Sequence, residues 1–121
     1  MRFLFKWFTR KRKRVHLELD VGSVLEAFDA SAGHQILDVR TEKEMDRDRI
    51  SDNQIEIDLF QPEFMEMVNQ LDRSKVYFIY CRSGSRSATA CKAMIDLGFD
   101  KVNNIAGGIV KWRSVHGPRK L

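Results

Sequence analysis

Residues 75–87 have the sequence Lys75-Val76-Tyr77-Phe78-Ile79-Tyr80-Cys81-Arg82-Ser83-Gly84-Ser85-Arg86-Ser87. The first six are rich in β-branched and aromatic side chains and predict a buried strand. Residues 86–97 have the composition of a helix, and Gly98 is a typical helix stop. The stretch therefore predicts a strand, a tight loop and a helix, with Cys81 at the carboxyl end of the strand.

The position of Cys81 is one that makes cysteines reactive. Loop N–H groups and the positive end of the helix dipole converge on the sulfur, and Arg82 and Arg86 add positive charge. All three effects favour the thiolate, which is the nucleophilic form. The alternative is a cysteine of the core, because free cysteine is often buried. A merely buried cysteine requires neither two arginines nor Gly84, so we expect a reactive thiolate.

Strand-like and helix-like segments alternate along the chain. This alternation is typical of an α/β domain, in which helices cover both faces of a parallel sheet. Sites in such sheets form at the carboxyl ends of strands, where Cys81 and Asp38 both fall. Thr41 and Glu44 have the spacing of a helix-starting capping box. The predicted strands are 15–19, 35–39, 54–58, 75–80 and 102–105, and the predicted helices are 21–30, 41–49, 62–71, 86–97 and 109–115.

The size and composition fit one compact domain. The chain has 121 residues, of which 43% are apolar, and this is enough for a core. We place the domain at residues 15–117, between an N-terminal tail, 1–14, and a C-terminal tail, 118–121. Two cysteines do not make a disulfide framework, so a reducing compartment and a cytoplasmic location are predicted. The three histidines are scattered and form no cluster at zinc spacing, so we expect no metal site. We also expect a monomer without a cofactor.

The positive charge of the chain is concentrated in the N-terminal tail. Residues 1–14 hold seven Lys and Arg residues and no acid, whereas the whole chain has a net charge of +4. The remaining residues therefore carry about −3, the difference between +4 and +7. Because the domain itself is not basic, we expect it not to bind nucleic acid.

The tail combines aromatic and basic side chains. Met1-Arg2-Phe3-Leu4-Phe5-Lys6-Trp7-Phe8 is followed at once by the basic run. The apolar part is shorter than the ~20 residues that span a bilayer, and its charge order is not that of a signal peptide. Such a segment suits the surface of an anionic membrane, here the inner membrane surface. The alternative is a solvated or loosely packed N-terminus.

Three segments resemble the rhodanese family of single-domain sulfurtransferases, in the family's order. They cover about residues 15–117, and the resemblance implies a rhodanese-like fold with a central parallel five-stranded sheet. The segments are Leu37-Asp38-Val39-Arg40 with Glu44, then Tyr80-Cys81-Arg82-Ser83-Gly84-Ser85-Arg86-Ser87-Ala88, then Asn104-Ile105-Ala106-Gly107-Gly108-Ile109 with Trp112.

The resemblance implies a thiosulfate sulfurtransferase. The Cys81 thiolate takes the outer sulfur of a small anionic donor such as thiosulfate and becomes a persulfide, which a thiol or cyanide acceptor then discharges. Arg82 and Arg86 can orient the anion through charge-assisted hydrogen bonds. Gly84 lets the backbone bend so that N–H groups point at one spot. The serines Ser83, Ser85 and Ser87 can line the pocket or cap the helix.

Residues outside the loop are expected to position it. Asp38 can accept hydrogen bonds from backbone N–H groups or a loop arginine, and Arg40 and Glu44 can pair across the short helix. Gly107, Gly108 and Trp112 are interpreted as setting the last turn and its packing. Cys91 is interpreted as a small core residue, although a resolving cysteine remains an alternative.

One segment departs from the family. Residues 48–54 read Asp48-Arg49-Ile50-Ser51-Asp52-Asn53-Gln54, where the family usually has Gly-His-Ile and then Pro-Gly-Ala. Only the isoleucine is kept, so the local turn cannot be taken from the family.

Two other functions remain open. Cysteine phosphatases and arsenate reductases use a similar loop, but their signature places five residues between cysteine and arginine. Only four separate Cys81 from Arg86, and no aspartate general acid is evident. A non-catalytic rhodanese-like binding module is the other alternative, although such modules typically lose the cysteine or the loop arginines.

Overall fold

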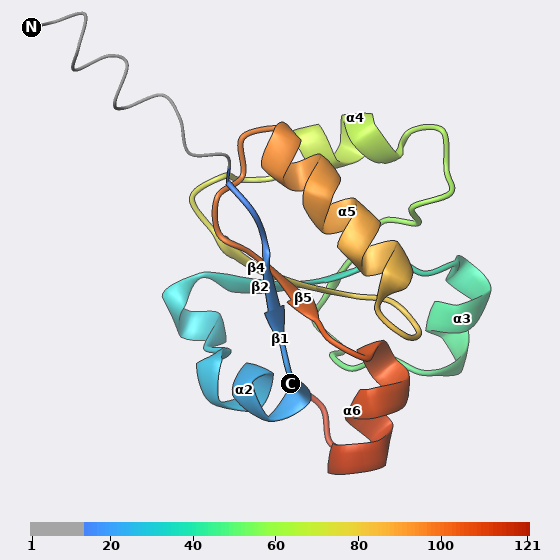
Figure 1. Cartoon of the computed structure of the whole chain (residues 1–121). Coiled ribbons are helices and arrows are strands. Elements are labelled where there is room, and N and C mark those ends of the chain that lie inside the picture. Colours follow the sequence, from blue (N-terminus) through green and yellow to red (C-terminus); the bar gives the residue numbers. More distant parts are fainter. Residues whose placement is uncertain (1–13) are drawn as a thin grey trace, which may run out of the picture.

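The computed structural model, which describes residues 14–121, contains one five-stranded sheet (Figure 1). Across the sheet the strands follow the order β1-β5-β4-β2-β3, and every neighbouring pair is parallel. This confirms the predicted fold class. The strands are β1 (Leu17–Leu19), β2 (His34–Asp38), β3 (Ile55–Glu56), β4 (Val76–Tyr80) and β5 (Val102–Ile105).

Strand β4 lies in the middle of the sheet and carries the reactive loop at its end. Its register places Phe78 opposite both Ile36 of β2 and Asn103 of β5. Asp38, the last residue of β2, lies opposite Tyr80, the last residue of β4. The carboxyl ends of the two strands are therefore level, and Asp38 lies beside the residue that precedes Cys81.

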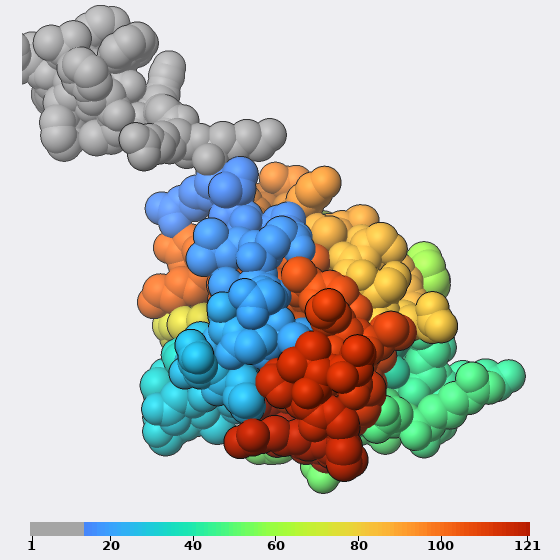
Figure 2. Space-filling view, turned by 60° about the horizontal axis from the view of Figure 1, so that its bottom comes forward, coloured from blue at the N-terminus to red at the C-terminus, as the bar shows by residue number. Residues whose placement is uncertain are grey.

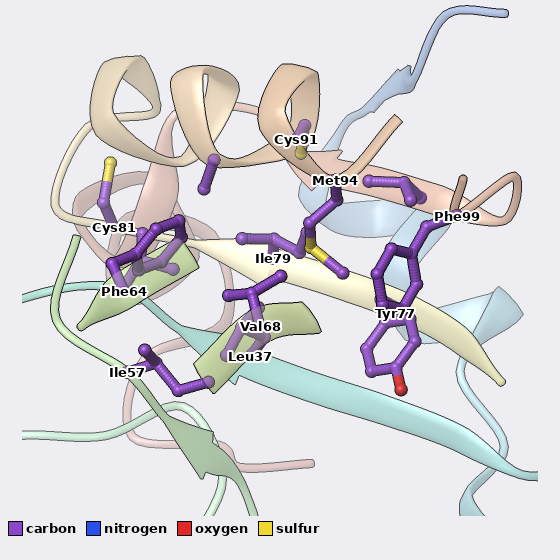
Figure 3. Close-up of a cluster of buried hydrophobic side chains, with 13 residues drawn as sticks. Leu37, Ile57, Phe64, Val68, Tyr77, Ile79, Cys81, Cys91, Met94 and Phe99 are labelled. Atoms are coloured by element: carbon purple, nitrogen blue, oxygen red, sulfur yellow. The ribbon is translucent and has the colours of Figure 1, made fainter. Parts of the chain in front are cut away.

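Helices cover both faces of the sheet, and each face has its own core (Figure 1). Helices α4 and α5 pack on one face, where Val68 and Met94 meet Leu37 and Ile79 (Figure 3). Helices α2 and α6 pack on the other, where Trp112 is fully buried. The helices are α2 (Val21–Ala27), α3 (Glu42–Arg47), α4 (Phe64–Asn69), α5 (Ser85–Asp96) and α6 (Gly108–His116), with a short 3-10 turn at Ala30–Ala32.

Several predicted bounds are wrong: β1 begins at Leu17 instead of Val15, α2 ends at Ala27 instead of Ala30, and α4 and β3 are also shorter than predicted. Helix α4 begins at Phe64 instead of Pro62, because Asp58 first forms a turn in which its side chain and carbonyl accept the N–H groups of Phe60 and Gln61. Strand β3 is reduced to two residues. The chain nevertheless stays beside β2, since the N–H of Ile57 donates to the carbonyl of Asp38.

The last residues of the chain pack back onto the domain. The indole N–H of Trp112 donates to the carbonyl of Arg119, and the N–H of Leu121 donates to the carbonyl of Ile50. The Leu121 side chain packs against the α2/α6 core. The segment 118–121 is thus held against the domain by backbone and side-chain contacts.

The N-terminal tail lies almost wholly outside the described residues. Of residues 1–14, only Arg14 is described, and its guanidinium pairs with Asp100 at 2.7 Å. The membrane-surface interpretation of the tail therefore stays a prediction. Between residues 14 and 121, no helix combines the length and apolar character that crossing a membrane requires.

Candidate active site

Three hydrogen-bond donors surround the sulfur of Cys81. The N–H of Gly84 lies 3.1 Å from Sγ, the N–H of Ser87 3.4 Å and the Ser87 hydroxyl 3.3 Å. The sulfur lies at the N-terminal side of α5 (Figure 3). The residue is only 1% exposed. This arrangement stabilises negative charge on the sulfur, because donors and the helix dipole point at it together.

The backbone of Gly84 makes this convergence possible. Gly84 precedes the first residue of α5 and has a φ of 109°, which side-chain-bearing residues rarely adopt. An added Cβ would also lie 3.3 Å from the N of Gly107. No side chain caps this helix, so of the two roles predicted for the loop serines, capping the helix is excluded.

The pKa of the Cys81 thiol is lowered by its hydrogen bonds. Burial is the largest single influence and acts in the opposite direction, but the hydroxyl and N–H of Ser87 and the N–H groups of Gly84 and Ser83 together outweigh it. Arg82 and Arg86, which were expected to favour the thiolate, are not among the main causes that lower this pKa. In the structure the backbone of the loop and Ser87 carry the effect.

Arg86 is held by Glu44 of α3 in a bidentate pair. Its two terminal nitrogens lie 2.7 and 2.8 Å from the carboxylate oxygens, and its guanidinium lies over the ring of Phe60. The hydrogen bond to Arg86 is the main cause that lowers the pKa of Glu44 to about 2. Glu44 also completes the predicted capping box with Thr41. The expected side-chain pair of Arg40 and Glu44 is therefore wrong, because Glu44 pairs with Arg86 instead.

Asp38 and Arg40 form a buried ion pair beneath the loop. Arg40 Nη2 lies 2.6 Å from Asp38 Oδ2, and the Arg40 N–H also donates to that carboxylate. The guanidinium further donates to the Tyr80 hydroxyl and to the carbonyls of Glu44 and Asp48. Arg40 thus ties β2, β4 and α3 together, while the loop arginines do not reach Asp38.

The remaining loop side chains face solvent. Arg82, Ser83 and Ser85 are exposed, and within residues 14–121 their side chains make no hydrogen bond or ion pair. Ser87, in contrast, is fully buried against the sulfur. The structure therefore divides the predicted binding residues into a buried set around Sγ and an exposed set at the surface.

Two residues outside the loop hold it in place, and neither was predicted to contact the loop. Asn104 of β5 is buried, and its amide donates to the carbonyl of Gly84 and to the carboxylate of Glu18. Gly108 lies so close to the loop that an added Cβ would be 2.4 Å from the Arg82 oxygen. The sequence does contain one indication of the role of Asn104. It is one of two adjacent asparagines in the buried strand Val102–Ile105, and buried polar side chains need hydrogen-bond partners.

The segment that departs from the family is fixed by contacts of this chain's own. Arg113 of α6 donates to both carboxylate oxygens of Asp48 and to the carbonyl of Arg49. The Tyr80 hydroxyl accepts the N–H of Ile50, which is buried. These contacts define a turn without the glycine and proline of the usual pattern.

Cys91 lies in the core, further along α5 (Figure 3). It is fully buried among Ala90, Met94 and their neighbours, and burial raises the pKa of its thiol. Both cysteines are free thiols. No group of three or more His, Cys, Asp or Glu side chains able to hold a metal occurs in the described part of the chain.

The fold and the site together define an α/β protein with a cysteine at the end of the central strand, in a loop whose hydrogen-bond donors point at the sulfur. The rhodanese-like domain family matches residues 21–115. The chain therefore belongs to the rhodanese-like domain family.

Several relatives are sulfurtransferases by name. A putative sulfurtransferase of Bacillus subtilis is 28% identical over 102 residues, which span 84% of this chain and 95% of the relative. A sulfurtransferase of Allochromatium vinosum is 33% identical over 96 residues, spanning 78% and 86%. A crystal structure of a rhodanese-related protein from Thermoplasma volcanium superposes with a TM-score of 0.72 at 28% identity, covering 85% of this chain and 96% of that one.

Proposed function

We propose that this protein is a sulfurtransferase that carries sulfane sulfur on Cys81, with thiosulfate as a competent donor. The observation that carries the proposal is the group of donors around Cys81 Sγ at 3.1 to 3.4 Å. Such a cradle favours the thiolate, and the thiolate is the form that attacks sulfur. The names of its relatives support the same class of reaction.

The first half-reaction loads the sulfur. The Cys81 thiolate attacks the outer sulfur of thiosulfate, a new S–S bond forms, and the bond to the inner sulfur breaks. The electron pair of that bond leaves with sulfite, so no outside oxidant is needed. The exposed guanidinium of Arg82 and the half-buried Arg86 offer positive charge to the dianionic donor.

The second half-reaction unloads it. An acceptor thiolate or cyanide attacks the outer sulfur of the persulfide, and the S–S bond to Cys81 breaks. The electron pair returns to Sγ, which is again a thiolate held by Ser87 and Gly84. The same donors therefore stabilise both the nucleophile of the first step and the leaving group of the second.

Intact-mass spectrometry after incubation with thiosulfate tests the proposal. We expect the mass to rise by one sulfur atom in the wild type and in Cys91→Ser, and not in Cys81→Ser. Cyanide should remove the added sulfur and release thiocyanate. If no sulfur is gained with any donor, the chain is a binding module; turnover of para-nitrophenyl phosphate without sulfur transfer would instead identify a phosphatase.

A further inference from the structure

The carbonyl oxygen of Gly84 has more hydrogen-bond donors around it than it can accept. The N–H of Ala88 and the amide nitrogen of Asn104 each lie 3.1 Å from it, and the hydroxyl of Ser87 lies 3.2 Å away. A carbonyl oxygen has two lone pairs, so only two of these three donors can be accepted well. The bond from Ala88 is the first backbone bond of α5, so the helix keeps it, and Asn104 and Ser87 compete for the second lone pair.

Ser87 is the competitor that has the sulfur as a second acceptor. Its hydroxyl lies 3.3 Å from Cys81 Sγ, and it has one proton to donate. When the Asn104 amide occupies the second lone pair of the Gly84 carbonyl, the Ser87 proton is directed to the sulfur. A hydrogen bond donated to the sulfur favours its charged form, so the occupancy of this carbonyl affects whether Cys81 is a thiolate.

Glu18 determines which way the Asn104 amide faces. It lies on β1 directly opposite Asn104 of β5, and both of its carboxylate oxygens are 3.0 Å from Asn104 Nδ2. A carboxylate only accepts hydrogen bonds, so it attracts the NH2 end of the amide and repels Oδ1. One N–H then donates to Glu18 and the other to the Gly84 carbonyl. The buried Oδ1 has no partner within residues 14–121, so the orientation comes from the acceptors around the NH2 group alone.

His16 holds Glu18 in place for this contact. Its Nε2 lies 2.7 Å from Glu18 Oε2, and only 11% of the His16 side chain is exposed. Glu18 is half exposed, because β1 is an edge strand of the sheet and the blue N-terminal segment that contains it lies at the surface (Figure 2). His16, Glu18 and Asn104 therefore form a hydrogen-bonded chain from the edge of the sheet to the Cys81 loop.

We propose that Glu18 is a positioning residue for the Cys81 thiolate. Acting through Asn104, Glu18 keeps the Gly84 carbonyl occupied and thereby directs the Ser87 hydroxyl to the sulfur. In giving Glu18 a part in the reaction, this inference rests on the proposed function, in which the thiolate is the nucleophile.

The charge of Glu18 acts in the opposite direction to its hydrogen bond. An anion near Cys81 disfavours a second anion, and the charge of Glu18 is one of the causes that raise the pKa of Cys91. Removing the carboxylate should therefore lower the pKa of Cys81 if only charge matters, and raise it if the hydrogen bond to Asn104 matters. The sign of the change separates the two effects.

Alkylation of Cys81 by iodoacetamide, followed by intact mass over a range of pH, tests the proposal. Glu18→Met removes the acceptor, whereas Glu18→Gln retains an oxygen to which the Asn104 amide can donate. Glu26→Met is the matched control, because Glu26 is exposed on α2, which packs on the face of the sheet opposite α5. We expect Glu18→Met to raise the pKa of Cys81 and to slow alkylation at pH 7 about threefold, less than the loss of a whole hydrogen bond. Glu18→Gln should react at least as fast as wild type, and Glu26→Met at the wild-type rate.

A double substitution tests whether Glu18 acts through Ser87. In the Ser87→Ala protein there is no hydroxyl to direct, so adding Glu18→Met should slow alkylation no further. Equal slowing in both backgrounds, unchanged or faster alkylation of Glu18→Met, or a Glu18→Gln protein as slow as Glu18→Met would overturn the proposal.

Two controls keep this test decisive. Alkylation of the buried Cys91 as well would mark a Glu18→Met protein that has unfolded, and Glu18→Val, with a side chain typical of strands, then takes its place in the same comparison. No sulfur donor is used, so a failure of sulfur loading would contradict the proposed function while the alkylation rates still decide the role of Glu18.

Discussion

At the scale of single residues, Ser87 has a choice of hydrogen-bond acceptors. Its hydroxyl lies 3.3 Å from Cys81 Sγ and 3.2 Å from the carbonyl oxygen of Gly84, but a hydroxyl carries one proton. With a neutral thiol the proton can go to the carbonyl, and with a thiolate it goes to the sulfur. When the Cys81 thiol loses or gains its proton, the hydrogen bonds around it can therefore adjust by rotation of the Ser87 O–H bond alone.

The contribution of Ser87 is testable by removing its hydroxyl. We expect Ser87→Ala to raise the pKa of Cys81, because one of the donors that lower it is lost. At pH 7 the thiolate fraction falls, and alkylation by iodoacetamide should slow about fivefold, which corresponds to one hydrogen bond of about 1 kcal/mol. Ser85→Ala is the control, because Ser85 is in the same loop and its side chain does not contact the sulfur. Equal alkylation rates for Ser87→Ala and wild type would show that the Ser87 hydroxyl does not lower the pKa of Cys81.

The Glu44–Arg86 pair should make the free energy of unfolding depend on pH in the acidic range. Folding lowers the pKa of Glu44 from 4.5 to about 2, chiefly through the hydrogen bond to Arg86. The stabilisation is complete above pH 4.5 and is lost as the pH falls toward 2. Glu44→Gln should therefore lower the free energy of unfolding by about 1–2 kcal/mol at pH 7.

Urea unfolding at several pH values measures this effect. The gap between wild type and Glu44→Gln should narrow steadily below pH 4.5. Glu66→Gln serves as the control, because Glu66 is exposed on α4 and makes no ion pair within the described residues. A gap that is the same at pH 7 and pH 3 would show that the charge of Glu44 is not what stabilises the protein.

At the scale of elements, the start of α6 fixes the Cys81 loop. The N–H groups of Ile109 and Val110 donate to the carbonyl oxygens of Cys81 and Arg82, at 3.0 and 3.1 Å. N–H groups at the start of a helix have no acceptor within the helix, and here two of them donate to carbonyl oxygens of the loop. The loop is thereby held against a rigid helix. This approach is close enough that only glycine fits at position 108.

Gly108 and Gly117 have similar φ angles, so substituting each by alanine distinguishes the effect of the close contact with the loop from the effect of backbone strain alone. Gly108 has a φ of 60° and Gly117 a φ of 62°, but only at Gly108 does a Cβ meet the backbone of the loop, whereas nothing lies within 4 Å at Gly117. Gly117→Ala should cost about 1–3 kcal/mol of strain and leave Cys81 reactivity unchanged. Gly108→Ala should cost more and also slow alkylation of Cys81. Thermal unfolding and alkylation rates measure both; equal behaviour of the two variants would contradict the supporting role of α6.

Local signals allowed most of the elements to be predicted. The run 75–80, the capping box of Thr41 and Glu44, and the strand Val102–Ile105 all form as expected. The start of α4 was wrong, because the favourable position of Pro62 does not reveal the turn formed by Asp58. Strand β3 was predicted but made too long, at 54–58, since alternation in sequence does not tell where pairing with β2 ends.

Long-range contacts explain what could not be predicted of the site. Cys81 and the loop are contiguous in sequence, so their convergence on the sulfur followed from local geometry. Glu44 reaches Arg86 across 42 positions, and Asn104 reaches the Gly84 carbonyl across 20. Nothing in the spacing of these residues indicates their contact, which depends on the order of strands in the sheet.

At the scale of the whole molecule, charge is divided between the tail and the domain. The tail carries +7 in residues 1–14, and we propose that it holds the protein at an anionic membrane surface. The full chain should co-sediment with vesicles containing phosphatidylserine and be released by high salt, because surface electrostatics are screened. A chain starting at residue 15 should stay in the supernatant. Equal behaviour of both chains on these vesicles would refute the proposal.

The central claim is that Cys81 is a stabilised thiolate in a cradle of hydrogen-bond donors. Its most direct test is an NMR titration of protein labelled with carbon-13 at the cysteine Cβ, in which Cys91 is an internal reference. We predict that the Cys81 resonance titrates below the ordinary thiol pKa of 9.0, while Cys91, whose pKa burial raises, does not titrate in that range. A Cys81 resonance that titrates at or above 9.0 would contradict the account.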